Sequence, residues 1–212
     1  MRVNHLKSNQ IDIDEKKALR YLRYKGTHID KKTSKSIKES ITELKEIGQT
    51  KYVYSTFNIK TENHTINFDD QLIVDSKNLS KLYRNCVKST IFAATIGFQV
   101  EKRISYYSKT NLSKAVIFDA CAGAYIESLC DYIEAEIKEI AGKKGYGTTY
   151  RYSPGYGDFP ISYQAQILKL LNTEKYIGLV TNESHILLPR KSVTAFIGWN
   201  SGRLDPSPCP TL

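Results

Sequence analysis

The sequence predicts an α+β fold with a largely antiparallel, twisted sheet and flanking helices. Segments rich in β-branched and aromatic residues are mixed with segments whose apolar residues recur at helical spacing, and the last strand-like segments follow one another directly. The chain has 212 residues, of which 41% are hydrophobic and 25% are charged, as in an ordinary globular protein.

Two helices are expected in the first part of the chain. The first runs from residue 15 to about residue 25, with Asp14 as its cap and Gly26 as its end. The second covers residues 30–47 and ends at Gly48, because its apolar residues share one face. We therefore expect residues 1–50 to be an N-terminal helical region and residues 51–212 to be an α+β core, together forming one compact unit.

The middle of the chain is expected to contain both strands and helices. Residues 51–60 predict a strand, and residues 65–74 predict one or two more, with a break at Asp69 and Asp70. A helix is expected over residues 76–85, where apolar residues up to Cys86 share a face. Residues 89–97 are nearly all apolar, which is typical of a buried strand, and a helix from residue 98 continues through a break near Asn111.

The longest predicted element is a helix from Leu112 to about Ala141. It contains a run of small residues around Gly123, a residue type that costs about 1 kcal/mol inside a helix. Small side chains allow close approach of another backbone or of a ligand, and tight helix packing is the favoured interpretation. Glu127 follows one turn later in apolar surroundings, so its carboxylate lies either at a helix edge in water or toward a polar site.

The C-terminal part is expected to form a helix and then strands. A glycine-rich loop, GKKGYGTT, precedes the helix, which covers residues 162–172 and has Ser162 as its cap. Three strands are predicted at residues 178–181, 185–188 and 192–199, and the proline-rich tail is expected to be irregular.

Composition excludes several classes of protein. No apolar run is long enough to span a bilayer, and the N-terminus lacks the apolar core of a signal peptide, so we expect a cytoplasmic protein. The histidines are scattered and no HExxH motif occurs, which argues against a metal site. Without a CxxC pair, the cysteines are expected to be buried thiols, at positions Cys86, Cys121, Cys130 and Cys209.

The net charge of +9 has three interpretations: a solvated surface, a nucleic-acid partner or an acidic protein partner. The segment KKALRYLRYK, residues 16–25, comes closest to a nucleic-acid-binding pattern of basic and aromatic residues. Its Ala18, Tyr21 and Leu22 recur at helical spacing, however, which favours packing of the tyrosines at the flank of a helix.

The most informative segment is RYSPGYGDFPISYQ, residues 151–164. Arg151 can form a two-pronged contact with a carboxylate, and Gly155 and Gly157 allow a ligand to approach the backbone. The ring of Tyr156 can stack on a flat ligand. Elsewhere the chain has no P-loop, no GxGxxG after a strand and no GxSxG. Physical arguments alone favour a plain strand-to-helix connection whose arginine pairs with a surface acid.

Three segments together resemble the reactivation, or activation, domain of cobalamin-dependent methionine synthase, which binds S-adenosylmethionine. RYSPGYGDFPISYQAQILKLL resembles the family's Arg-x-x-Pro-Gly-Tyr motif with its following proline and short helix. TNESHILLPRKSVTAFIGW, residues 181–199, resembles a segment with Thr-Glu-Ser, Pro and Ser-Val. AYIESLCDYIEAEI resembles the long helix that bears a glutamate near the ligand. Their order and approximate spacing agree, and the resemblance covers the second half of the chain better than the first.

The resemblance implies how the ligand would be held. Arg151 would bind the methionine carboxylate of S-adenosylmethionine, and Glu127 would lie near the sulfonium. The backbone around Ser153 and Gly155 would meet the adenine edge. The full set of implied ligand-binding residues is Glu127, Arg151, Ser153, Pro154, Gly155, Tyr156, Glu183 and Ser184.

The resemblance also implies a function: a free-standing accessory subunit that reactivates a corrinoid methyltransferase, specifically a split methionine synthase. In that family the cobalamin is occasionally oxidised, and one electron from a flavodoxin-like donor with methyl transfer from S-adenosylmethionine restores it. The domain then acts by positioning, without a side-chain acid or base, and a partner protein carries the cobalamin. The alternatives are a basic nucleic-acid-binding module that uses the first two helices, or a scaffold that kept the fold and lost the ligand.

Overall fold

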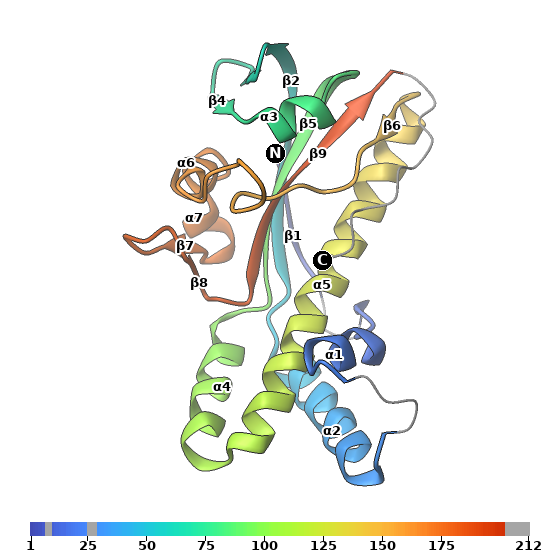
Figure 1. Cartoon of the computed structure of the whole chain (residues 1–212), viewed down its shortest axis with the longest axis vertical. Coiled ribbons are helices and arrows are strands. Elements are labelled where there is room, and N and C mark those ends of the chain that lie inside the picture. The colour runs from blue at the N-terminus through green and yellow to red at the C-terminus, as the bar shows by residue number, and fades with distance from the viewer. Residues whose placement is uncertain (7–9, 25–28, 202–212) are drawn as a thin grey trace.

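An antiparallel sheet runs through the centre of the molecule (Figure 1). The structure is a computed structural model that describes residues 1–6, 10–24 and 29–201. In this part of the chain the sheet has seven strands in the order β4-β3-β2-β5-β9-β6, and β1 also pairs with β2. The strands are β1 Arg2–His5, β2 Lys51–Glu62, β3 Thr65–Phe68, β4 Leu72–Asp75, β5 Cys86–Thr95, β6 Gly147–Thr148 and β9 Ser192–Asn200, with β7 Val180–Thr181 and β8 Leu187–Leu188 in a separate hairpin.

Helices cover both faces of this sheet. The long helix α5 lies against one face together with α1, α2 and α4, and α3, α6 and α7 pack on the other face. The helices are α1 Glu15–Tyr21, α2 Lys31–Ile47, α3 Lys77–Leu82, α4 Phe98–Thr110, α5 Leu112–Lys143, α6 Tyr163–Leu170 and α7 Thr173–Ile177.

The two faces of the sheet bury two separate hydrophobic cores. Side chains on a strand alternate between the faces, so Tyr52 and Tyr54 of β2 join the core under α5, whereas Val53 between them joins the core under α6. Strand β5 alternates in the same way, with Phe92 and Ala93 on opposite sides. A strand that is buried on both faces has a nearly continuous run of apolar residues in its sequence. For this reason residues 89–97 show no alternation of apolar and polar residues.

The predicted fold class is confirmed, and so are most of the helices and strands. Asp14 caps α1 as expected, and Asp30 caps α2; each accepts a hydrogen bond from a backbone N–H group of its helix. The strand pair β3 and β4 breaks at Asp69 and Asp70, both of which have positive φ angles. Asn111 separates α4 from α5, and its side chain accepts a hydrogen bond from the backbone of α5.

Several details of the sequence prediction were wrong. The helix expected over residues 76–85 ends at Leu82, and Cys86 begins strand β5 instead of lying on the helix face. Ser162 makes no side-chain capping bond to α6. The strands β1 and β6 and the helix α7 were not expected; β1 and β6 are short and held by backbone pairing to β2 and β9, which leaves little side-chain pattern.

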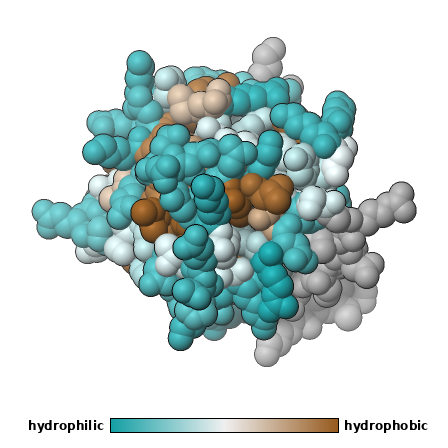
Figure 2. Space-filling model, turned by 90° about the horizontal axis from the view of Figure 1, so that it is seen from above, coloured by the Kyte–Doolittle hydropathy of each residue, from teal (hydrophilic) through white to brown (hydrophobic). Residues whose placement is uncertain are grey.

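The first fifty residues share a core with the rest of the chain. Ile11, Ile13 and Ala18 are buried in the same cluster as the α5 side chains, and β1 adds to the central sheet. The first helix ends at Tyr21, about four residues before its expected end, so that expectation was wrong. The expected stop residue Gly26 and the proline-rich tail after residue 201 lie outside the described residues. Figure 2 shows the molecule end-on, with a mainly hydrophilic surface interrupted by small hydrophobic patches.

Two further expectations concern cysteines and membranes. Cys121 and Cys130 are buried free thiols, Cys86 is half-buried, and Cys209 lies outside the described residues. In the described part of the chain no helix combines the length and the apolar composition of a membrane span.

Candidate functional site

The turn that carries Arg151 is anchored to the sheet at both of its ends. Tyr152 pairs with Phe196 of β9 through two backbone hydrogen bonds of 2.9 and 2.8 Å. The ring of Phe159 is 1% exposed and packs edge-on against Phe196, with 5.2 Å between the ring centroids. The chain between these two aromatic residues therefore has fixed ends, and it leads from β6 to α6 (Figure 1).

The two glycines of this turn have different surroundings. Gly157 has a φ of +55°, and a Cβ there would lie 2.3 Å from Nδ2 of Asn78 and 2.6 Å from the hydroxyl of Tyr152. Gly155 has a φ of +95°, but a Cβ there would meet no described atom within 4 Å. Gly157 therefore closes the turn against α3, whereas Gly155 leaves backbone accessible beside Tyr156, which is 45% exposed.

Asp158 ties the same turn to the N-terminus of α3. Its carboxylate accepts hydrogen bonds from the Ser76 hydroxyl at 2.6 Å and from the backbone N–H groups of Lys77 and Asn78 at 2.7 and 3.2 Å. These hydrogen bonds, that from Ser76 above all, hold the pKa of Asp158 below its usual range. The turn is thus held by a helix cap in addition to its backbone pairing.

Arg151 lies against a row of three carboxylates on α5. Its Nη1 donates to Oδ1 of Asp131 at 2.8 Å and to Oε2 of Glu134 at 2.7 Å, and its Nη2 donates to Oε2 of Glu127 at 2.8 Å. The three acids are spaced i, i+4 and i+7, so they share one face of the helix. We call Glu127, Asp131, Glu134 and Arg151 the arginine cluster.

The arginine cluster is partly shielded from water. The side chain of Arg151 is 24% exposed, and those of Glu127 and Glu134 are 34% and 27% exposed. Burial alone would lower the pKa of Arg151, but the groups around it, the carboxylates included, raise it, so its charge is permanent. Partial burial would likewise raise the pKa of Asp131, but hydrogen bonds and positive charge from Lys17 and Arg151 hold it below its usual range.

Helix α1 completes the surroundings of the arginine cluster. Lys17 forms an ion pair with Asp131, and its side chain is 16% exposed. Tyr21 packs over Gly123, one turn before Glu127. The segment that came closest to a nucleic-acid-binding pattern therefore turns Lys17 and Tyr21 toward α5, as the helical spacing of its apolar residues indicated.

The structure brings together some of the residues singled out in the sequence. Glu127, Arg151 and the turn from Ser153 to Tyr156 lie in one region, with Pro154 buried. Glu183 and Ser184 are exposed in the turn between β7 and β8, a hairpin that projects from the α6 side of the sheet (Figure 1). No described contact links that hairpin turn to the arginine cluster.

Sequence reasoning missed Asp131, Glu134, Lys17 and Tyr21. The two acids carried a usable signal, because they follow Glu127 at helical spacing on the same face. No sequence signal could have placed Lys17 and Tyr21 against α5, because the packing of α1 on α5 is a contact between distant parts of the chain. The sequence alone also allows a purely structural interpretation, in which Arg151 pairs with a surface acid. The structure contains such ion pairs, and three acids share the guanidinium.

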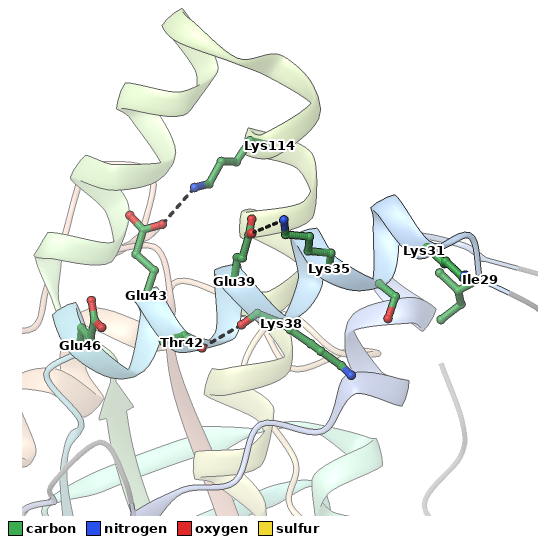
Figure 3. A pocket seen from close by; sticks show the side chains of 10 residues that line it. Ile29, Lys31, Lys35, Lys38, Glu39, Thr42, Glu43, Glu46 and Lys114 are labelled. Carbon is green, nitrogen blue, oxygen red and sulfur yellow. Dashed lines mark hydrogen bonds and ion pairs between the residues drawn. The ribbon is translucent and has the colours of Figure 1, made fainter.

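A surface depression lies elsewhere among the described residues. It has a volume of about 850 Å³ and lies between α2 and the beginning of α5 (Figure 3). Its charged side chains pair with one another, Lys114 with Glu43 at 3.3 Å and Lys35 with Glu39 at 3.9 Å. Such a groove is a solvated, ion-paired helix face, and none of its lining residues belongs to the arginine cluster. Within the described ranges no group of His, Cys, Asp and Glu side chains could hold a metal ion.

Comparison with known proteins identifies the fold. No protein-family model matches the sequence, and no curated protein matches it. Among solved structures, the chain is similar to the MetH reactivation domain bound to AdoHcy, with a TM-score of 0.72 over 96% of this chain and 79% of that one. The two sequences are 15% identical, so the similarity shows a shared fold. The expected likeness to the methionine synthase reactivation domain is confirmed at that level.

Proposed function

We propose that this chain binds S-adenosylmethionine at the arginine cluster and supplies its methyl group to reactivate a corrinoid methyltransferase, as the accessory subunit of a split methionine synthase. The observation that carries the proposal is the similarity over 96% of the chain to a domain solved with AdoHcy. AdoHcy is what remains of S-adenosylmethionine after its methyl group has left.

The charges of the site suit this ligand. Three carboxylates face two cations, Arg151 and Lys17, which leaves one net negative charge. S-adenosylmethionine has a positive sulfonium and a positive ammonium group, and a partly shielded carboxylate such as Glu127 would offset either of them.

Arg151 retains the capacity to bind the ligand's carboxylate. A guanidinium has five N–H groups, and its hydrogen bonds to described residues are three. The carboxylates of α5 fix the orientation of the guanidinium, so a ligand carboxylate would meet a preorganised donor. The open backbone at Gly155, with Ser153, Pro154 and Tyr156 beside it, would then receive the adenine end.

The proposed role needs positioning and no acid or base on this chain. The cobalt that accepts the methyl group would belong to a corrinoid-binding partner, and a flavodoxin-like protein would supply the electron, all in the cytoplasm. The net charge of +9 supports docking to acidic surfaces of these partners. Binding to either partner should therefore weaken as salt is raised, and binding that is unchanged at high salt would contradict this part of the proposal.

Calorimetric titration with S-adenosylmethionine tests the ligand. We expect the wild type to bind and Arg151→Met to lose about tenfold or more in affinity, as for loss of charge-assisted hydrogen bonds. Lys143→Met is the matched control, because Lys143 pairs with Glu139 at the far end of α5 and is 73% exposed. Absence of binding by the wild type would overturn the ligand assignment, whereas equal binding by Arg151→Met would overturn only the role of Arg151.

A further inference from the structure

Helix α1 lies across α5 beside the arginine cluster and presents one aromatic ring there. Ala18 is fully buried between the helices, and Lys17 is held by Asp131. Tyr21, the last residue of α1, is 52% exposed, so part of its ring contacts α5 and part faces solvent. The ring is therefore held in place and still accessible to a ligand.

Gly123 explains why the ring can lie so close to α5. A Cβ at Gly123 would lie 3.3 Å from two ring atoms of Tyr21 and 3.4 Å from a third. A side chain there would have to push the ring away from the helix. Glycine is unfavourable inside a helix, and here it provides the space that the aromatic ring occupies.

Two other groups of the candidate site act electrostatically on the Tyr21 hydroxyl. Glu127 follows Gly123, the residue under the Tyr21 ring, by one turn of α5. Burial above all, and then the charges of Glu127 and Tyr156, raise the pKa of Tyr21 to about 12. The phenol is thus neutral at physiological pH. Tyr21 is thus within electrostatic range of one carboxylate, that of Glu127, and of a second aromatic side chain, Tyr156.

We propose that Tyr21 is a specificity-determining residue that recognises the positive sulfonium of the methyl donor, together with Tyr156 and Glu127. The proposal rests on the proposed function and deepens it. An aromatic face attracts a cation through its quadrupole, and a nearby carboxylate adds to that attraction. AdoHcy has a neutral sulfur, so its sulfur is attracted neither to the aromatic face nor to the carboxylate. The site would therefore prefer the methyl donor over its demethylated product.

The test compares the two ligands in matched variants. For Tyr21→Leu we expect the affinity for S-adenosylmethionine to fall by about threefold to thirtyfold, while the affinity for AdoHcy changes by less than about twofold. Tyr21→Phe keeps the ring and should keep the preference. Equal losses for both ligands, or no loss for either, would overturn the assigned role of Tyr21.

A second pair of variants tests the placement of the ring. Gly123→Ala should displace Tyr21 and lower the preference for S-adenosylmethionine, whereas Gly142→Ala should not, because a Cβ at Gly142 meets no described atom within 4 Å. An unchanged preference in Gly123→Ala would contradict the proposed placement of the ring. Wild type that binds neither ligand would overturn the proposed function itself, which separates that failure from a failure of Tyr21 alone.

Discussion

Replacing Arg151 by methionine should destabilise the protein even without any ligand. Methionine keeps much of the apolar stem of arginine but removes the positive charge that three carboxylates share. The variant leaves Glu127, Asp131 and Glu134 as neighbouring like charges on one helix face, with Lys17 as the remaining cation that contacts them among the described residues.

The size of the effect follows from the exposure of these groups. Removing one partner of a fully buried ion pair costs about 3–5 kcal/mol, because it leaves an uncompensated charge. The carboxylates here are between 27% and 49% exposed, so water stabilises part of their charge. We therefore expect Arg151→Met to lower the free energy of unfolding by roughly 1–3 kcal/mol at neutral pH.

The same variant should show a pH dependence of known sign. The folded-state pKa of Asp131 is held below its usual range, so its stabilising contribution is complete above the unfolded-state pKa of about 3.9 and is lost as the pH falls through the folded pKa. The stability difference between wild type and Arg151→Met should thus be complete at pH 7 and should shrink only as the pH falls below about 4.

Urea unfolding followed by circular dichroism at pH 7 and at about pH 2.5 measures both effects, because the lower pH lies below the unfolded-state pKa of the carboxylates. Lys143→Met is the control, since its pair with Glu139 is exposed on both sides and contributes little to stability. Wild-type stability in Arg151→Met at pH 7, or a loss that stays constant on acidification, would refute the argument that Arg151 is held by ionised carboxylates.

Four further variants test the turn and the core. Gly157→Ala should destabilise the protein by about 1–3 kcal/mol, because residue 157 has a positive φ and a Cβ there would clash with α3. Gly155→Ala should destabilise it less, because the space around residue 155 is open. Thermal unfolding of the two variants compares these losses. Asp158→Ala should lose about 0.5–2 kcal/mol by removing the hydrogen bonds that Asp158 accepts from Ser76, Lys77 and Asn78 at the N-terminus of α3. Because the folded pKa of Asp158 is lowered, this contribution should shrink as the pH falls below about 4, and equal losses at pH 7 and pH 2 would contradict this. Tyr125→Phe should lose about 1–2 kcal/mol in urea unfolding, because it leaves the buried Thr50 hydroxyl without its 2.8 Å partner.

Much of the fold could be predicted from the sequence because it depends on local patterns. The apolar spacing of α5 and of α2 predicted two helices, and the capping residue Asp14 predicted the beginning of α1. Strand β1 escaped prediction because its pairing with β2 is made by backbone groups, which every sequence has. Cys86 was assigned to a helix because apolar spacing over one turn does not distinguish a helix from the strand that follows it.

Part of the candidate site could likewise be predicted from the sequence, and part of it only the tertiary structure revealed. The sequence by itself singled out Arg151, its glycine-containing turn and Glu127 as candidates, because residue types and short motifs can be recognised without knowing which residues are in contact. Only the tertiary structure showed that Asp131 and Glu134 meet the same guanidinium and that Tyr21 lies over Gly123. The physical reason is that the pairing of Tyr152 with β9 sets the position of Arg151, and burial of Ala18 sets that of α1. Both are contacts between distant parts of the chain, and no local pattern records them.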